Sequence, residues 1–266
     1  MTLLYYGLSD VGHKREKNED SLLINDSLNL FIVADGMGGH LGGEQASRIA
    51  VKTIEEVLKN LDEDPDATMT TDQHFDVADM KDRLKYSIQV ASARVFEEAA
   101  QDPNLRGMGT TVVLLWVHDG KGYIANVGDS RAYLVRGESV RQLTTDHSLV
   151  NEQLQAGFIS REDARNHKLR NIITRSVGFQ EEVDTDVQEI DLEPFDRILL
   201  CSDGLTNRVD DKKILEVMER QKTARKACEK LIEKANKNGG DDNITTVVVQ
   251  VAADDPEATT TLGETA

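Results

Sequence analysis

The sequence is poor in cysteine, and this shortage limits the kinds of site it can build. The 266 residues include two cysteines, Cys201 and Cys228, whose positions show neither metal-ligand spacing nor a disulfide framework. Cys201 lies in the apolar run RILLCSDG, where a small buried thiol is the expected role. A chain without a disulfide framework suits a reducing compartment, so we expect a cytoplasmic protein.

Basic residues are also scarce, with 31 Lys and Arg against 48 Asp and Glu and a formal net charge of −17. Nucleic acids and anionic membranes are bound by clustered cations, so neither is expected as a partner. The sequence has no apolar run long enough to span a bilayer, and its first residues, MTLLYYGLSD, lack the pattern of a signal peptide. An acidic protein can still act on a phosphorylated substrate if bound cations reverse the local charge.

The apolar pattern predicts eight strands and four helices. The strands are expected at residues 3–8, 21–24, 30–34, 110–117, 122–127, 132–136, 197–201 and 244–251. The helices are expected at about residues 46–58, 77–101, 210–221 and 223–236. The two strands joined by HDGK should pair in antiparallel fashion. This order favours sheets packed with helix pairs over a doubly wound parallel sheet.

Two acidic segments fall outside this pattern. Residues 62–76, DEDPDATMTTDQHFD, are turn-rich and are expected to form an exposed loop. Residues 253–266 carry four acids, no base and no aromatic residue, which predicts a disordered tail. We therefore expect a single domain over residues 1–252.

Aspartates accumulate at the ends of the apolar runs. FIVADG, IANVGDS and ILLCSDG each contain one, and GGDDNITTVVVQV places two before another run; these are Asp35, Asp129, Asp203, Asp241 and Asp242. Where glycine follows the aspartate, it permits a sharp turn and leaves its own carbonyl free as a further oxygen ligand. Rigid strands that carry carboxylates at their ends are good supports for a metal site.

Converging carboxylates repel one another, by roughly 4 kcal/mol for two unit charges 4 Å apart at an effective dielectric of ~20. They therefore imply either raised pKa values or bound cations. Oxygen ligands suit Mg²⁺ or Mn²⁺, and the lack of a His/Cys cluster argues against zinc. Two such ions can activate a shared water and clamp a phosphate. On spacing alone, a metal site and a set of ordinary Asp-Gly turns both remain open.

Seven motifs occur in a specific order between about residue 6 and residue 251. They are SDVGHKREKNEDS, VADGMGGHLGGE, GMGTTVV, IANVGDSRAYL, RNIITRSVG, LLCSDGLTN and GGDDNITTVVV. Together they resemble the type 2C, metal-dependent protein serine/threonine phosphatases in their compact bacterial form. The resemblance implies an α+β fold, a four-layer α-β-β-α sandwich of two antiparallel sheets flanked by helix pairs. It also implies hydrolysis of phosphoserine and phosphothreonine by metal-activated water, opposing a bacterial Ser/Thr kinase.

The resemblance also assigns roles to individual acids. Asp35 would bridge two Mn²⁺ or Mg²⁺ ions, and the carbonyl oxygen of Gly36 would bind one of them. Asp203 and Asp242 would complete the shell of the other ion. Asp129 would help Asp203 to hold a third ion, as in bacterial members of the family.

Three further residues of the first motif receive roles in the same way. Glu19 and Asp20 would hold metal-bound waters without touching the ions. Arg15 would grip the substrate phosphate, for which a guanidinium fork is well shaped. Without the resemblance, Arg15 would be taken for a solvated residue of a basic loop.

One position departs from the family pattern. Some members carry a histidine directly after the Asp-Gly pair, as a proposed acid that protonates the leaving alkoxide, and this chain has Met37 there. His40, His13 and metal-bound water are alternatives that the sequence does not rank.

Residues 145–178 resemble the family's flap, and we call them the flap segment. Polar composition, short helical pieces and Gly157 suit a mobile lid that samples substrates. Arg170 and Arg175 could contact a phosphopeptide, with ordinary surface or structural pairing as the alternative for each. The substrates are expected to be phosphoproteins, and a monomer is the default expectation for the oligomeric state.

Two rival interpretations fit the sequence less well. A dinucleotide-binding fingerprint starting at Gly36 requires glycine at its sixth position, which is Leu41, and no Walker A lysine follows the glycines. A phosphatase-like sensor without catalysis should lack one of the ligand acids, yet Asp35, Asp203 and Asp242 are all present. No cysteine lies in a phosphate-binding loop, so a thiolate nucleophile is not expected.

Overall fold

The computed structural model describes residues 1–38, 42–64, 75–165 and 167–253. His40, most of the loop expected at residues 62–76 and nearly all of the tail expected at residues 253–266 lie outside this part of the chain. Among the described residues, no helix is long and apolar enough to cross a bilayer.

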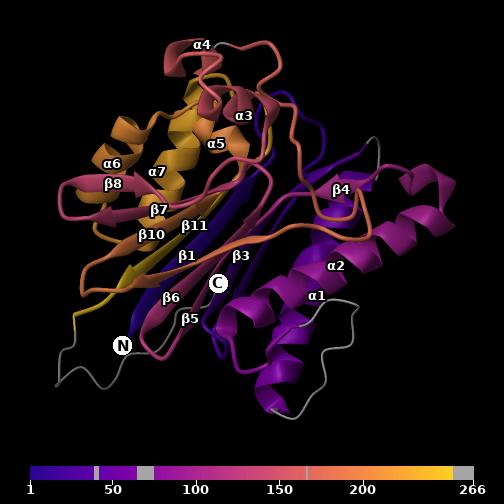
Figure 1. Cartoon of the computed structure of the whole chain (residues 1–266). Coiled ribbons are helices and arrows are strands. Elements are labelled where there is room, and N and C mark those ends of the chain that lie inside the picture. The colour runs from indigo at the N-terminus through magenta and orange to yellow at the C-terminus, as the bar shows by residue number, and fades with distance from the viewer. Residues whose placement is uncertain (39–41, 65–74, 166, 254–266) are drawn as a thin grey trace.

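Two antiparallel sheets form the centre of the molecule (Figure 1). The first sheet has the strand order β1 (Leu3–Asp10), β11 (Ile244–Val251), β10 (Arg197–Cys201), β7 (Arg131–Arg136) and β8 (Ser139–Gln142). The second has the order β2 (Asp20–Asn25), β3 (Leu30–Met37), β5 (Val112–His118), β6 (Lys121–Val127) and β9 (Asp186–Asp191), with β4 (Gly109–Thr110) paired to β3. The antiparallel pairing predicted for the strands joined by HDGK is confirmed.

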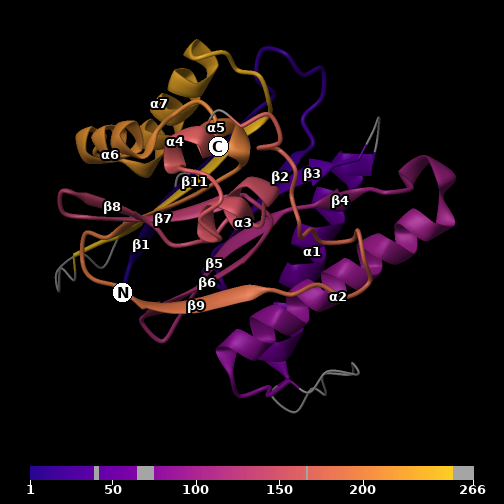
Figure 2. The same ribbon diagram turned by 45° about the horizontal axis from the view of Figure 1, so that its top comes forward.

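Two pairs of helices cover the outer faces of the sheets (Figures 1 and 2). Helices α1 (Gly42–Glu63) and α2 (Met80–Gln101) pack on the second sheet, and α6 (Asp211–Arg220) and α7 (Ala224–Lys237) pack on the first. Each of α2, α6 and α7 begins after a side-chain cap that accepts a backbone N–H, which satisfies one of the free donors of the first turn. The predicted four-layer sandwich is confirmed.

The central strands read as continuous apolar runs because both of their faces are buried. In β3, Ile32 packs toward the helices, whereas Phe31 and Val33 enter the core between the two sheets. Strand β10 divides in the same way, with Leu200 between the sheets and Leu199 under α6 and α7. Successive side chains of a strand point to opposite faces, so each strand serves two cores.

The chain differs from the predicted elements at several points. Strand β3 continues to Met37 instead of ending at residue 34, and the strand predicted at 110–117 is interrupted at Thr111. Strands β8 and β9 were not predicted, because they lie at sheet edges and alternate polar with apolar residues in only short runs. After Cys201 the chain enters a short helix, α5 (Asp203–Thr206), where a turn was predicted.

The flap segment contains two short helices, α3 (Leu149–Gln155) and α4 (Arg161–Arg165). These helices lie at the top of Figure 1, at the same end of the sandwich as α5. The N-terminus lies at the opposite end. A 3₁₀ turn at Pro103–Leu105 follows α2.

The packing of α1 against α2 can be tested by a substitution in the core between them. Leu58 of α1 is fully buried with Ile54 and Leu84, so Leu58→Ala should leave a cavity and lower the free energy of unfolding by about 2–5 kcal/mol. The neighbouring Lys59 is exposed, and Lys59→Ala should change it by less than about 0.5 kcal/mol. Urea denaturation of both variants measures the difference, and equal stabilities would contradict this packing.

Candidate metal centre

A pocket of about 360 Å³ opens at the end of the sandwich that carries α5. It is lined by twelve residues, which are Arg15, Glu19, Asp35, Gly36, Met37, Gly38, Thr111, Asp129, Asn171, Ile173, Asp203 and Asp242. Five of these side chains are carboxylates, and they come from segments more than 200 residues apart in the sequence. The fold therefore brings together five of the acids that the sequence singled out, all but Asp20 and Asp241, with a basic side chain beside them.

Both sheets contribute to the pocket. Asp35 is two residues after Val33 in β3, so its side chain lies on the same face of the strand as those of Phe31 and Val33. That face points toward the space between the sheets. Asp203 follows β10 and Asp242 precedes β11, two neighbouring antiparallel strands of the first sheet, so both residues lie at the same end of that sheet. Asp129 occupies the turn between β6 and β7, where the chain crosses from the second sheet to the first.

The interruption at Thr111 holds Asp35 in place. The Asp35 amide donates a hydrogen bond to Thr111 Oγ1 at 3.0 Å, and the Thr111 amide donates to the Asp35 carbonyl oxygen at 2.9 Å. Thr111 Oγ1 also lies 2.7 Å from Ser130 Oγ, which follows Asp129. A buried hydroxyl pair thus connects the backbone of Asp35 to the turn that carries Asp129, a link that the sequence analysis missed although Thr111 belongs to the GMGTTVV motif.

The glycines after two of the aspartates have a different role from the predicted one. A Cβ atom on Gly36 would lie 2.1 Å from the carbonyl oxygen of Gly43, and one on Gly204 would lie 2.0 Å from that of Asn243. The sharp turn predicted at Gly36 is wrong, because β3 runs through it. These positions need glycine because another backbone segment packs directly against them.

Asp20 lies behind the pocket and does not line it. It pairs with Asp35 in the register of β2 and β3, and its Oδ2 accepts hydrogen bonds from Ser202 Oγ at 2.8 Å and Thr245 Oγ1 at 2.6 Å. Its Oδ1 is buried and has no hydrogen-bond partner among the described residues. A buried carboxylate oxygen without a donor is costly, so this atom calls for a water or another donor.

Burial and mutual repulsion raise the pKa values of the acids. Burial is the main cause for Asp20, whose pKa is raised to about 7, and for Asp129, whose pKa is raised to about 8, with Asp203 as a further cause for both. Burial also raises the pKa of Asp35 well above its usual range, and neighbouring carboxylates add to this effect. The pKa of Asp203 is raised by burial and by the charge of Asp242. The protein itself supplies too little positive charge to keep these groups ionised.

The composition of the site fits Mg²⁺ or Mn²⁺. The donors are carboxylate and backbone oxygens, which hard divalent cations prefer, and no histidine or cysteine lines the pocket among the described residues. In that part of the chain, no three His, Cys, Asp or Glu side chains lie close enough together to hold a metal ion as they stand. Carboxylates spread around a pocket suit ions that keep several water ligands.

Cations of the protein offset part of the negative charge at the edges of the site. Arg15 Nη2 donates a hydrogen bond to Asp242 Oδ2 at 2.8 Å, and this bond is the main cause of a raised pKa for Arg15. The Arg15 side chain remains half exposed at the pocket wall. The adjacent Asp241 is paired with Lys14 and Arg208 instead.

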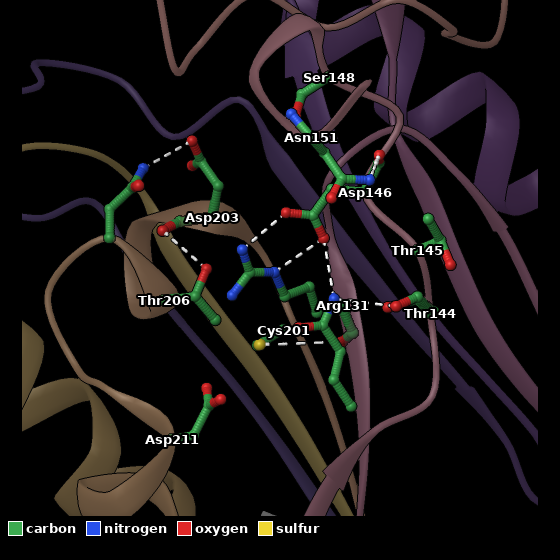
Figure 3. A network of polar contacts seen from close by, with 12 residues as sticks. Arg131, Thr144, Thr145, Asp146, Ser148, Asn151, Cys201, Asp203, Thr206 and Asp211 are labelled. Atoms are coloured by element: carbon green, nitrogen blue, oxygen red, sulfur yellow. Dashed lines mark hydrogen bonds and ion pairs between the residues drawn. The ribbon is translucent and has the colours of Figure 1, made fainter. Parts of the chain in front are cut away.

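A second cation lies deeper, behind Asp129 and Asp203. The guanidinium of Arg131 donates two hydrogen bonds to the carboxylate of Asp146, at 2.8 and 2.6 Å, and its charge partly offsets the raised pKa values of both pocket aspartates (Figure 3). Asn207 Nδ2 donates to Asp203 Oδ2 at 2.9 Å. The sequence analysis did not identify Arg131, although the residue belongs to the IANVGDSRAYL motif.

The flap segment contributes residues other than the predicted arginines. Asn171 and Ile173 line the pocket, whereas Arg170 and Arg175 do not. Arg175 Nη1 donates to Asp186 Oδ1 at 3.1 Å, which is the structural pairing considered as the alternative for this residue. An uncharged residue such as Asn171 or Ile173 cannot be identified as a substrate contact from a single sequence.

Met37 lines the pocket at the position where some members of the family have histidine, and His13 does not line it. The His13 amide donates to the Gly240 carbonyl oxygen at 2.7 Å, which fixes the loop that leads to Arg15. Neither position therefore places an imidazole at the wall of the pocket.

The raised pKa values predict that the metal-free protein loses stability as pH rises. Asp20 and Asp129 keep their protons to higher pH in the folded protein than in the unfolded chain, so the folded state binds more protons between about pH 5 and pH 8. In EDTA, the free energy of unfolding from urea denaturation should fall across this range. The fall should be smaller for Asp20→Asn, and Mn²⁺ should reduce it in the parent protein. A constant free energy of unfolding, identical in the variant, would contradict the charge analysis.

Comparisons with known proteins agree with this geometry. Residues 12–260 match the model of the protein phosphatase 2C family. The serine/threonine phosphatase stp of Listeria monocytogenes is 38% identical over 245 residues, which cover 91% of this chain and 93% of that protein.

Solved structures of phosphatases are also similar to this chain. The serine/threonine phosphatase PstP/Ppp of Mycobacterium tuberculosis superposes with a TM-score of 0.83 at 32% identity, covering 95% of this chain and 100% of that one. The catalytic domain of PstP in complex with two manganese ions superposes with a TM-score of 0.79 at 32% identity, covering 94% and 99%. Because the family model matches residues 12–260 and a relative is 38% identical over 91% of the chain, the chain belongs to the protein phosphatase 2C family.

Proposed function

We propose that this protein is a metal-dependent phosphatase that hydrolyses phosphoserine and phosphothreonine in proteins. The observation that carries the proposal is the gathering of Asp35, Asp129, Asp203 and Asp242 around one pocket that Arg15 also lines. Relatives named as serine/threonine phosphatases, at up to 38% identity over most of the chain, support it. A Ser/Thr kinase whose products it reverses is the natural counterpart of this activity.

The donor set supports Mn²⁺ or Mg²⁺ as the cofactor, and the PstP structure with two manganese ions supports two central ions. Asp35 is proposed to bridge them, with the Gly36 carbonyl oxygen on one ion and Asp203 and Asp242 on the other. Asp129, together with Asp203, is proposed to hold a third ion. Bound divalent ions would lower the pKa of a water and offset the charge of the phosphate, so that water attacks phosphorus directly.

The residues around the ions orient the reactants. Arg15 can leave Asp242 and donate to the phosphate oxygens, because its side chain is half exposed and a guanidinium pairs well with a phosphate. Glu19 lines the pocket, and Oδ1 of Asp20 has no hydrogen-bond partner among the described residues, so both carboxylates would be able to accept hydrogen bonds from metal-bound waters. Met37 carries no proton to donate, so the leaving alkoxide takes its proton from a group other than an imidazole at this position.

We place the whole activity in residues 1–252, with the flap segment as a lid and the acidic tail outside the catalytic unit. The lack of a disulfide framework supports a cytoplasmic enzyme, and the net charge of −17 argues against nucleic-acid or membrane partners. A monomer is the simplest state that contains a complete pocket. The competing hypothesis is a phosphate-recognising regulator without catalysis. The presence of every proposed ligand acid in one pocket favours the enzyme.

Metal dependence is the first test. A phosphothreonine peptide should be hydrolysed with Mn²⁺ or Mg²⁺ and not with EDTA. Residues that only orient metal ligands typically contribute 10–100-fold, so removing a ligand in Asp203→Asn should lower kcat/KM by more than about 100-fold. Asp211→Asn is the matched control, because Asp211 accepts a hydrogen bond from Tyr133 at 3.2 Å and lies outside the pocket. A folded protein without turnover in either metal would favour the regulator.

The role of Arg15 is tested by its effect on substrate binding. Loss of a charge-assisted hydrogen bond to phosphate costs about 1.5–3 kcal/mol, so Arg15→Ala should lower kcat/KM by about 10–150-fold. Lys14→Ala removes the neighbouring charge, which is paired with Asp241, and should change kcat/KM by less than about threefold. Equal effects of the two substitutions would indicate a general charge effect rather than a specific contact.

A further inference from the structure

The turn that carries Asp129 is tightly packed. Gly128 adopts φ +101°, and a Cβ atom on it would lie 2.6 Å from Thr111 Cγ2. The hydroxyl group of Thr111 is also hydrogen-bonded to that of Ser130, which follows Asp129 in the turn. The position of the Asp129 carboxylate therefore depends on how the backbone on each side of it is held.

Two consecutive residues at the base of the flap segment hold this turn from both sides. Before Asp129, the Gly128 amide donates to His147 Nδ1 at 3.1 Å, and the His147 amide donates to the Gly128 carbonyl oxygen at 2.9 Å. After Asp129, Arg131 forms its two hydrogen bonds to Asp146 (Figure 3).

His147 is itself fixed. Its side chain is 5% exposed, and because Nδ1 accepts a hydrogen bond, Nε2 is the nitrogen that carries the proton in the neutral ring. Arg175 Nη1, 3.4 Å from Nε2, can only donate, so it does not hydrogen-bond to Nε2 in this tautomer. Nε2 lies 3.2 Å from Asp186 Oδ2, and the other oxygen of Asp186 accepts a hydrogen bond from Arg175. A carboxylate behind a histidine selects the tautomer and orients the ring.

We propose that His147 is a positioning residue for metal binding. Its Nδ1 holds the Gly128 amide and so directs Asp129 into the pocket, while Asp186 keeps the ring in the tautomer that can accept. The inference rests on the proposed function, in which Asp129 is a metal ligand. His147 does not touch the pocket and acts through the turn.

The same residue contacts the flap segment. The Thr174 amide donates to the His147 carbonyl oxygen at 2.8 Å, next to Ile173, which lines the pocket. Asn126, which pairs with Asp186 in the register of β6 and β9, donates through Nδ2 to the Thr145 carbonyl oxygen at 3.1 Å. The Asp129 turn and the pocket-facing part of the flap segment are therefore held by one side chain and its backbone.

The experiment compares two variants that differ in one hydrogen-bond acceptor. His147→Asn can present an amide oxygen near the position of Nδ1, whereas His147→Leu has no acceptor and leaves the Gly128 amide unpaired. In EDTA, hydrogen exchange of the Gly128 amide, followed by NMR, should be about tenfold or more faster in the Leu variant than in the parent. The Asn variant should stay within about threefold of the parent.

Calorimetric titration with Mn²⁺ then tests the link to the metal. Partners that orient a ligand typically contribute 10–100-fold to metal affinity, so His147→Leu should weaken the binding step that depends on Asp129 by about this factor. His147→Asn should restore most of it. If His147→Leu does not fold, His147→Gln, whose amide reaches toward Asp186 rather than Gly128, is expected to behave in the same way as the Leu variant.

Asp129→Asn separates the two ways in which the inference can fail. If Asp129→Asn loses a Mn²⁺-binding step that His147→Leu or His147→Gln keeps at parental affinity, the positioning role of His147 is wrong. If Asp129→Asn binds the same number of ions with unchanged affinity, Asp129 is not a ligand, and that part of the proposed function is wrong. His118→Leu, at the far end of β5, is the control for loss of a histidine and should leave Mn²⁺ binding unchanged.

Discussion

The repulsion among carboxylates buried at one end of the sandwich governs the structure around them. Asp20, Asp35, Asp129 and Asp203 all have raised pKa values because burial removes them from water and neighbouring acids add to the cost. Folding must hold these groups together against that repulsion. The rigid supports for this task are strand ends from two sheets, a buried hydroxyl pair and backbone contacts that only glycine allows.

The protein offsets the repulsion only in part, and that incompleteness is functional. Arg131 is held behind the site by Asp146, so it moderates the charge without entering the pocket. Arg15 is paired with Asp242 at the rim, where it remains accessible. The remaining negative charge suits divalent cations, and bound cations would in turn allow an acidic protein to accept a phosphate.

The apolar runs and helical periods predicted the antiparallel strands and the helix pairs, because they reflect burial on a large scale, whereas the four layers and the roles of the carboxylates were implied by the family resemblance. Strand β9 could not be predicted, since an edge strand with charged residues has only a weak apolar pattern. The hydrogen bond between the Gly128 amide and His147 could not be predicted either, because two residues 19 positions apart show no pattern that links them. Gly36 was placed correctly but explained wrongly as a turn, because the close approach of Gly43 depends on how α1 packs. Arg15 was identified by family resemblance; its charge pattern alone gave no reason to choose it over its neighbours.

The site lies across the seam between the two sheets. Asp35 belongs to the second sheet, Asp203 follows one strand of the first sheet and Asp242 precedes its neighbour, and Asp129 lies where the chain passes from one sheet to the other. A sliding of one sheet over the other by the length of a single bond would change the separations among these oxygens, although no residue near the pocket had been altered. The apolar layer that includes Phe31 therefore acts as the spacer that sets the separations among the pocket carboxylates from a distance.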